Sequence, residues 1–298
     1  MARIITDLKN RFLAENIVGR LIYINVAVFL LFPLLDVFTL FNIPSPALYL
    51  KMWLELPSAP SDYIQQPWSL VTYMFLHGGL MHILWNMLAL YWFGKIFLSF
   101  FSTRHFVGLY LLGGIVGGIF FMLAYNVFPM FTSSGDKAYL VGASAAVLAI
   151  AIASAVRVPD YKINMLFIGE VKLSTLAVAT VIISLLLVTS NNAGGSFAHL
   201  GGAFAGWAFA YYLNKGRDLT LYINKAVDFV ADICKKDFKR ARKPKMNIFN
   251  AKRSGDYDYN AQKKEQNAEV DKILEKLKKS GYSSLTEEEK KKLFDASK

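Results

Sequence analysis

Six stretches of this chain are apolar along almost their whole length, and polar residues gather between them and after the last one. A helix needs about 20 apolar residues to cross a bilayer, so each stretch predicts a membrane span, of which the fourth is short. The predicted spans are residues 21–41, 68–98, 106–128, 142–156, 173–189 and 197–213. Between the first two, Ser45-Pro46 is typical of a helix start, and residues 47–56 predict a short helix in the membrane interface. The pattern therefore predicts an all-α membrane protein.

Basic residues are distributed unevenly over the loops, and this orients the predicted spans. The loops on one side hold nine Lys or Arg, whereas those on the other side hold two. The first group is Arg3, Lys9, Arg11, Arg20, Lys95, Arg104, Arg157, Lys162 and Lys172, and the second is Lys51 and Lys137. Because basic loops stay in the cytoplasm, we expect both termini there, and the even number of spans is consistent with this.

The composition agrees with a membrane domain followed by a polar tail. Hydrophobic residues make up 54% of the chain and the mean hydropathy is +0.34, which excludes an ordinary soluble domain. The residues after Asn214 hold 22 Lys and Arg against 14 Asp and Glu, so the tail carries +8 of the net charge of +11. Such a tail beside a membrane favours anionic lipid over nucleic acid. Cys234 is the one cysteine, which excludes an intrachain disulfide.

Four segments follow from these patterns. They are a cytoplasmic N-terminal segment without a signal-peptide pattern (1–20), the six-helix membrane domain (21–213), a basic linker (214–268) and a C-terminal helical hairpin (269–298). In the hairpin, Gly281 fits the end of one helix, and Thr286 with Glu289 fits a capping box at the start of the next. The hairpin is too small to bury much core, so we expect it to dock on a partner or on the rest of the chain.

Polar side chains lie at a common depth in three of the predicted spans. The second, fourth and sixth spans all enter from the outer side, which places His82, Asn86, Ser144 and His199 in the outer half of the membrane. Titratable side chains are costly there and need an explanation. Taken singly, each histidine fits a hydrogen bond that joins two helices, and Ser144 fits a bond to a carbonyl one turn earlier.

The spacing of small residues predicts that Ser144 and His199 meet. His199, Gly202 and Gly206 lie on one face of the sixth span and leave a groove without side chains. The alanine-rich fourth span is the natural partner for that groove, and this packing places Ser144 Oγ beside the His199 imidazole. A serine needs such an adjacent base to act as a nucleophile near neutral pH.

The remaining polar residues predict the rest of a site for acyl transfer. His82 and Asn86 share one face of the second span and can donate hydrogen bonds to an oxyanion, as can backbone N–H groups at the start of the fourth. No carboxylate lies in these three spans, so a Ser–His dyad is expected rather than a triad. A metal site is the rival interpretation, but His77 and His82 would diverge by about 140° on a continuous helix. We therefore expect neither a metal nor another cofactor.

Three motifs, in this order and spacing, resemble those of the rhomboid intramembrane serine proteases. They are His77-Gly-Gly-Leu-Met-His82-Ile-Leu-Trp-Asn86, Gly142-Ala-Ser144 and Ala198-His199-Leu-Gly-Gly202. The resemblance covers residues 21–213 and implies a six-helix fold with a water-filled cavity that opens outward. The tail hairpin resembles a short C-terminal module attached to some bacterial rhomboids, so the cell (inner) membrane is the expected location.

The resemblance also implies a role for each matched residue. Ser144 would be the nucleophile and His199 the general base, while His82, Asn86 and the Ser144 backbone N–H would be oxyanion donors. The implied supporting residues are His77, which matches a histidine above the site, Gly142 of the serine motif, and Gly202 and Gly206, which seat the sixth helix against the fourth.

Three positions depart from the family's pattern. Ala145 follows the serine where the family usually has glycine, and Leu148 stands where an aromatic residue commonly stacks on the histidine. The first-loop Trp-Arg motif is Trp68-Ser69 here. The first change adds a methyl group, and the second removes an aromatic face that would orient His199.

Together, the residues and the resemblance predict an intramembrane serine endopeptidase that cleaves transmembrane protein substrates near the outer membrane face. The expected partners are such a substrate and membrane lipid, without nucleic acid, and the oligomeric state is not predicted. The alternative is a non-catalytic rhomboid-like protein that binds membrane partners, which loss of Ser144 or His199 would indicate. A small transporter is a third hypothesis, against which the polar residues lie near one surface and the spans show no duplicated halves.

Overall fold

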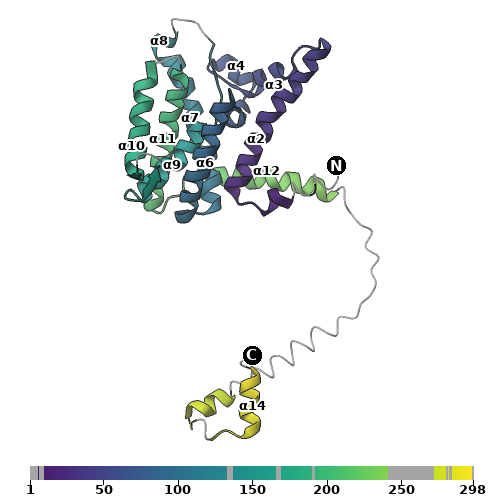
Figure 1. Cartoon of the computed structure of the whole chain (residues 1–298), viewed down its shortest axis with the longest axis vertical. Coiled ribbons are helices and arrows are strands. Elements are labelled where there is room, and N and C mark those ends of the chain that lie inside the picture. Colours follow the sequence, from purple (N-terminus) through teal and green to yellow (C-terminus); the bar gives the residue numbers. More distant parts are fainter. Residues whose placement is uncertain are drawn as a thin grey trace. The chain divides into compact units, whose positions relative to one another are not determined.

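The computed structural model describes residues 6, 10–132, 137–165, 169–189, 192–240, 272–279, 281 and 284–296. The chain forms two compact units, Met1–Lys236 and Asp237–Lys298. The first unit is a bundle of helices, and the second contains a short helical segment (Figure 1).

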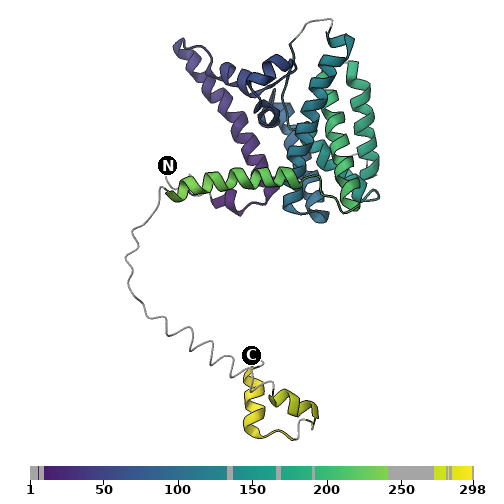
Figure 2. The ribbon, with the colours of Figure 1, turned by 180° about the vertical axis from the view of Figure 1, so that it is seen from behind.

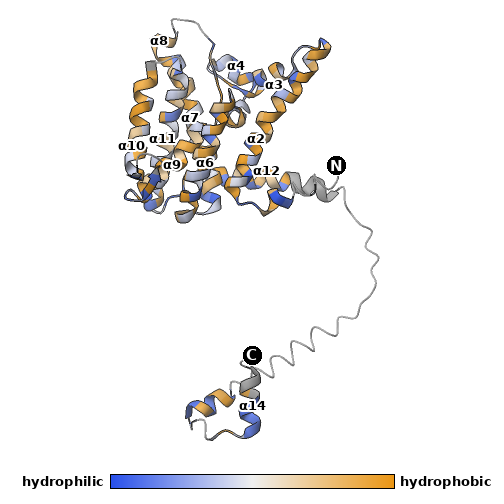
Figure 3. Ribbon diagram, in the orientation of Figure 1, coloured by the Kyte–Doolittle hydropathy of each residue, from blue (hydrophilic) through white to orange (hydrophobic). Residues whose placement is uncertain are grey.

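Six helices of the first unit occupy the positions of the predicted spans. They are α2 (Ile17–Asp36), α6 (Leu80–Phe100), α7 (Thr103–Val127), α9 (Ser144–Arg157), α10 (Leu173–Leu186) and α11 (Ala193–Asn214). Among the described residues, three stretches are long and apolar enough to cross a membrane, namely Ile17–Phe41, Leu80–Phe100 and Thr103–Val127, while α9 and α10 are apolar but shorter. Figure 3 shows this apolar character along the bundle.

Shorter elements connect these helices. They are η1 (Val37–Phe41), α3 (Pro46–Leu54), β1 (Leu56–Pro57), α4 (Pro60–Gln65), α5 (Ser69–Thr72), η2 (Tyr73–Phe75), α8 (Pro129–Thr132), β2 (Tyr139–Leu140), β3 (Lys162–Met165), β4 (Gly169–Lys172) and η3 (Leu187–Thr189). β1 pairs antiparallel with β2, and β3 with β4. The Ser45 side chain accepts a hydrogen bond from Leu48 N–H at the start of α3, as the Ser-Pro sequence predicts.

Helix α9 is the centre of the first unit. It packs against α6, α7 and α11, and every residue from Ala145 to Ala155 is buried. Because most of these residues are alanine, the surrounding helices come close to its backbone on several sides. α2, by contrast, packs chiefly against α6 and leans away from the other helices toward its C-terminal end (Figures 1 and 2).

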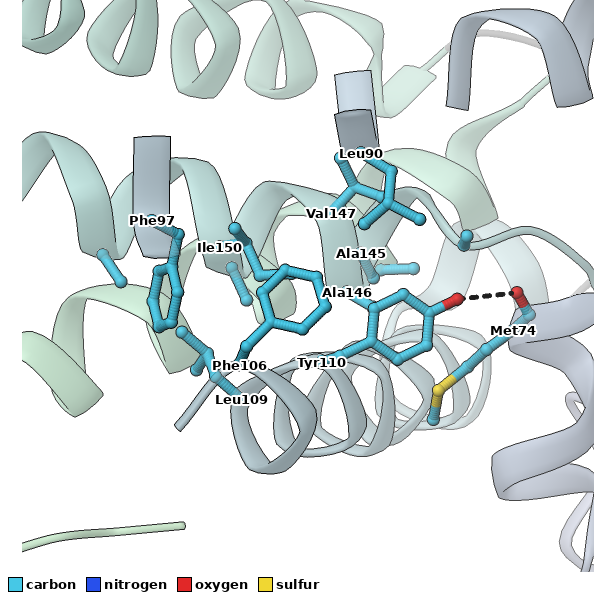
Figure 4. Close-up of a cluster of buried hydrophobic side chains, with 14 of the residues drawn as sticks. Met74, Leu90, Phe97, Phe106, Leu109, Tyr110, Ala145, Ala146, Val147 and Ile150 are labelled. Carbon is cyan, nitrogen blue, oxygen red and sulfur yellow. Dashed lines mark hydrogen bonds between the residues drawn. The ribbon is translucent and has the colours of Figure 1, made fainter. Parts of the chain in front are cut away.

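The core between α6, α7 and α9 combines aromatic side chains of α6 and α7 with aliphatic side chains of all three helices. Figure 4 shows these side chains, which include Leu90, Phe97, Phe106, Leu109, Tyr110, Val147 and Ile150. The buried Tyr110 hydroxyl donates to the Met74 carbonyl at 3.4 Å and so satisfies its polar group inside the core.

Part of the predicted basic linker is helical. Helix α12 (Leu221–Arg240) follows α11 after a short turn, whereas positions 241–268 lie outside the described residues. This helix was not predicted, because residues 214–268 are polar on average even though those of the first half follow an amphipathic helical pattern. At the other end of the unit, α2 begins at Ile17, inside the predicted N-terminal segment, of which positions 1–5 and 7–9 also lie outside the described residues.

The second unit contains a helix over residues 272–279 and α14 (Glu287–Ala296). Thr286 and Glu289 form the capping box that the sequence indicates, with Thr286 N–H donating to Glu289 at 2.8 Å and Glu289 N–H donating to Thr286 Oγ1 at 3.3 Å. Glu289 also pairs with Lys276 of the preceding helix at 2.9 Å. Positions 269–271, 280, 282–283 and 297–298 of the predicted hairpin lie outside the described residues.

Candidate active site

Ser144 is the first residue of α9, and the backbone that leads into it is held from both sides. β2 comes before it and is paired to β1, and Gly142 N–H donates to the Tyr73 carbonyl at 3.0 Å. Gly142 has φ +126°, a conformation that glycine adopts readily and other residues rarely do. A side chain there would also lie 2.8 Å from the His82 ring. Glycine is therefore needed where the chain turns from β2 into α9.

His199 lies on α11, and its ring contacts the serine directly. His199 Nε2 is 2.8 Å from Ser144 Oγ, which is hydrogen-bond distance. The helices approach this closely because Gly202 and Gly206 face α9, where a Cβ atom on either residue would collide with a backbone carbonyl. The structure thus brings together the two residues whose contact the small-residue faces predict.

Among the described residues, His105 pairs with a carboxylate, that of Asp218 at 3.5 Å. No carboxylate of the described residues pairs with His199. Asp136, the loop acid nearest to the site in sequence, lies outside the described residues. The described residues also include no group of three His, Cys, Asp or Glu side chains placed to hold a metal ion. The arrangement is therefore a serine beside a histidine, with the base in reach of the hydroxyl.

The second predicted span is not one continuous helix, which corrects its predicted bounds of 68–98. After η2 the chain becomes extended, and α6 begins only at Leu80. The pair Gly78-Gly79 accounts for the break, because glycine is a poor helix former and Gly79 lies in extended backbone with φ 174°. His77 therefore precedes the helix, and its ring centroid is 5.2 Å from that of His82. The predicted divergence of these two histidines is wrong.

His82 and Asn86 lie one turn apart on α6. The Gly78 N–H donates to His82 Nδ1 at 3.3 Å, which leaves the hydrogen of a neutral ring on Nε2, on the side of the ring that faces Gly142. Asn86 Nδ2 donates one hydrogen bond to the His82 carbonyl at 2.9 Å and retains a second N–H. Both side chains therefore keep a donor beyond the bonds that they make to α6 and its approach.

One cavity contains the four polar residues that the sequence places at a common depth. Its volume is about 850 Å³, and Ser144, His199, His82 and Asn86 all line it. The other lining residues come from α6, α9, α10, β2 and the ends of α7 and α11, and most of them are apolar. The cavity thus combines a polar cluster with an apolar wall, the usual character of a small-molecule or peptide site.

The departures at positions 145 and 148 have different surroundings. The Ala145 methyl faces α7, where a Cβ on Gly117 would lie 2.6 Å from it. Leu148 lines the cavity and also packs with Ala151, Ile152 and Ala203. Position 145 is therefore a packing position, whereas position 148 borders the site. At the third departure Ser69 is buried, and the neighbouring Trp68 indole donates to the Trp53 carbonyl at 2.8 Å.

Sequence reasoning missed the contribution of Tyr73. Its carbonyl accepts the Gly142 N–H, and its hydroxyl donates to the Gly114 carbonyl of α7 at 2.7 Å. Tyr73 therefore ties the turn before Ser144 to a neighbouring helix. Its position in a mostly apolar run, next to Thr72, was no sign of this role.

Comparisons with known proteins give matches to two parts of the chain. A family model described as "Rhomboid domain" matches residues 65–216, and one described as "Family of unknown function (DUF6576)" matches residues 254–298. "RHOMBOID-like protein 12, mitochondrial" of Arabidopsis thaliana is 28% identical over 158 residues, which cover 50% of this chain and 47% of that protein. "Rhomboid protein 1, mitochondrial" of Saccharomyces cerevisiae is 29% identical over 209 residues, which cover 67% of this chain and 54% of that protein. The chain thus spans about half the length of these curated relatives.

Proposed function

Since this chain belongs to the rhomboid family of membrane proteins, we propose that it is an intramembrane serine endopeptidase acting through Ser144 and His199. The observation that carries the proposal is the 2.8 Å contact between Ser144 Oγ and His199 Nε2 inside a cavity of about 850 Å³. A serine hydroxyl becomes a useful nucleophile when a base lies within hydrogen-bond distance.

The proposed reaction has two halves. His199 Nε2 takes the proton of Ser144 Oγ as the oxygen attacks the scissile carbonyl, and it then gives that proton to the leaving amine as the peptide bond breaks. A water molecule attacks the resulting ester, gives a proton to His199, and releases the carboxylate as the serine recovers its proton. The same histidine therefore serves as base and acid in turn, and no carboxylate is needed for the proton balance.

Charge that develops on the carbonyl oxygen would be stabilised from α6 and from the start of α9. The free donors are His82 Nε2 and the second N–H of Asn86, and the Ser144 backbone N–H points out of the first turn of α9. The positive end of the helix dipole adds to this stabilisation. Loss of one such donor typically costs about 100- to 1000-fold in kcat.

His77, Gly142, Gly202 and Gly206 would act by positioning. The His77 ring packs edge-on against His82, with an angle of 67° between the rings, and so limits how His82 turns. The glycines set the backbone spacing that brings Ser144 to its base. We expect substitutions at these four positions to disturb the geometry of the dyad without removing a reacting atom.

The proposed substrate is a transmembrane protein, cleaved near the outer membrane face. A helical peptide bond is shielded by its own backbone hydrogen bonds, so the substrate must unwind locally to reach Ser144. The proposed topology has six crossings with both termini in the cytoplasm, in the cell (inner) membrane. It is supported by helices at all six expected positions and by the uneven distribution of Lys and Arg over the loops.

A fluorophosphonate probe tests the proposal because it reacts with activated serines. The native protein should be labelled, and Ser144→Ala should abolish labelling. Ser154→Ala is the matched control, since Ser154 lies on the same helix but donates its hydroxyl to the Ile150 carbonyl at 2.8 Å. Equal labelling of the native protein and Ser144→Ala would overturn the assignment. Normal biological function in a Ser144→Ala strain would favour a non-catalytic protein that binds membrane partners.

A further inference from the structure

Helix α12 has an apolar side that the described part of the protein leaves uncovered. Five large apolar side chains in the described part of the helix are exposed. Apart from Leu221 at its first position, the other four lie within about a third of its circumference at 3.6 residues per turn. They are Tyr222, Phe229, Val230 and Ile233, with exposed fractions of 78%, 68%, 58% and 47%. Exposed Lys225 and Asp232 lie beyond the edge of this arc. The helix is therefore amphipathic, and its apolar side needs a partner.

Contacts with α7 fix where α12 begins and how it is turned. The buried Thr220 and Asn224 pack against Gly108 of α7, where a Cβ would lie 2.5 Å from Thr220. One turn further along α12, Asp228 forms an ion pair with Arg104 of α7. A helix held at two successive turns cannot rotate freely, so the direction of the apolar side is a property of the fold.

The turn before α12 is held as well. Asp218 accepts hydrogen bonds from the Thr220 N–H at 2.8 Å and from its hydroxyl at 2.6 Å, which fixes the turn just before the helix. The same carboxylate lies 3.5 Å from His105 of α7. α11 is thereby followed by a rigid corner, and the chain leaves the bundle in one direction.

This corner lays α12 across the end of the bundle at which α7 begins. Figures 1 and 2 both show α12 crosswise to α7 and α11, and it extends past the near end of α2. Hydrophilic residues gather at this same end (Figure 3). A helix that leaves a membrane domain crosswise at its polar end lies parallel to the membrane surface and at its level.

The basic residues on and after α12 indicate what kind of surface the helix binds. Lys215, Arg217 and Lys225 are exposed in the turn and in the first half of α12. The sequence between Lys235 and Lys245 then contains seven Lys or Arg against one Asp. Clusters of this kind beside a membrane domain attract anionic headgroups, while Tyr and apolar residues enter the interface.

We propose that α12 is an interfacial helix that binds an anionic membrane surface. Tyr222, Phe229, Val230 and Ile233 enter the boundary between headgroups and acyl chains, while Lys225 contacts lipid phosphates. The corner formed by Asp218 and Thr220 presents this helix to the lipid in a fixed orientation. The partner of the surface is thus lipid and not a second protein.

Spin labels on single cysteines test the proposal in the full chain. Cys234→Ser removes the native cysteine, and Val230→Cys and Asp232→Cys then form a matched pair, because two residues correspond to about 200° around a helix. The protein is placed in bilayers with and without phosphatidylglycerol. Collision rates are measured with oxygen, which concentrates in lipid, and with a water-soluble nickel complex.

The proposal requires a several-fold higher ratio of oxygen to nickel collisions at position 230 than at 232, with the larger ratio in the anionic bilayer. Equal nickel access at both positions would overturn the interfacial location. Protection of position 230 from both reagents would show a protein partner, such as a second copy of the chain, and would also overturn it. The same ratio in both bilayers would overturn the requirement for anionic lipid.

A charge variant separates local contact from net charge. Lys225→Gln with Lys236→Gln should reduce the difference between the two bilayers at position 230. Lys278→Gln with Lys279→Gln makes the same charge change in the second unit and should leave the difference intact. An equal reduction by both variants would refute a specific role for α12.

Discussion

The spacing of α7 and α9 depends on one pair of small residues, Gly113 and Ala149. In Gly113→Ala the new Cβ would lie within 3.0 Å of the Ala149 Cβ, closer than methyl groups approach one another. The next nearest atoms are Ala146 Cα at 3.3 Å and the Ala145 carbonyl oxygen at 3.4 Å, which small shifts can relieve. The collision is therefore almost entirely with one methyl group, and removing that group should relieve it.

The expected free energies follow from overpacking and helix propensity. Overpacking lowers the free energy of unfolding by up to about 3 kcal/mol. The higher helix propensity of alanine raises it by about 1 kcal/mol. Gly113→Ala should therefore lower the free energy of unfolding by about 2 kcal/mol. Ala149→Gly should also lose about 2 kcal/mol, half from propensity and half from the missing methyl. In the double variant the methyl group and the helix propensity are exchanged between the two positions, so we expect almost no loss of stability. The coupling energy between the two substitutions should therefore be about 3 to 4 kcal/mol.

Gly206 provides the contrast, because its new Cβ would meet the Ala149 carbonyl and not the Ala149 side chain. Ala149→Gly should therefore not rescue Gly206→Ala. Gly79→Ala is the neutral control, since no atom lies within 4 Å of a Cβ there, and its effect should stay within about 0.5 kcal/mol. Unfolding in mixed detergent micelles, followed by circular dichroism, measures all of these variants. A double variant as unstable as the sum of its parts would refute the reasoning.

Three further predictions concern the site and the loop that supports it. Gly142→Ala should slow probe labelling strongly and cost about 1–3 kcal/mol of stability, because φ +126° and the nearby His82 ring both oppose a side chain. Leu148→Tyr should raise turnover of a transmembrane substrate if a stacked ring orients the base, and unchanged turnover would show that leucine packs adequately. The Lys137 ammonium 2.8 Å from Asp62 holds the pKa of that carboxyl below its ordinary value. This pair should therefore stabilise the loop above about pH 4 and lose its effect as the pH falls through the lowered pKa, a dependence that Lys137→Gln should remove in acid titrations.

The contact between Ser144 and His199 could be predicted because it depends on two patterns that remain visible in a sequence. Loop charge and the order of spans give the depth of a residue, and glycine spacing on the sixth span gives the face that a neighbour approaches. The break before α6 could not be read in the same way, because residues 68–75 are as apolar as those that follow and form short helical turns themselves. Gly78-Gly79 was the available signal, and its effect depends on the extended conformation that the surrounding chain imposes.

Helix α12 was not predicted because the segment that contains it is mostly polar. Its polar residues dominate the composition of 214–268, and its apolar residues are too few for a span. The pattern that identifies it is the one-sided placement of Phe229, Val230 and Ile233, which composition averages out. An interfacial helix therefore has to be sought by periodicity within polar segments and not by hydropathy.

The departures from the family's pattern can now be separated by what their side chains touch. The methyl group of Ala145 meets α7 at Gly117, and a residue larger than glycine at 117 would contact both that methyl at 2.6 Å and the Ala198 carbonyl at 2.8 Å. Glycine at 117 therefore accommodates alanine at 145, and this departure changes packing on the side away from the cavity. Leu148 borders the cavity that contains His199. Of these two departures, we therefore expect position 148 to affect the proposed catalysis, and Ala145→Gly should leave the rate of probe labelling unchanged.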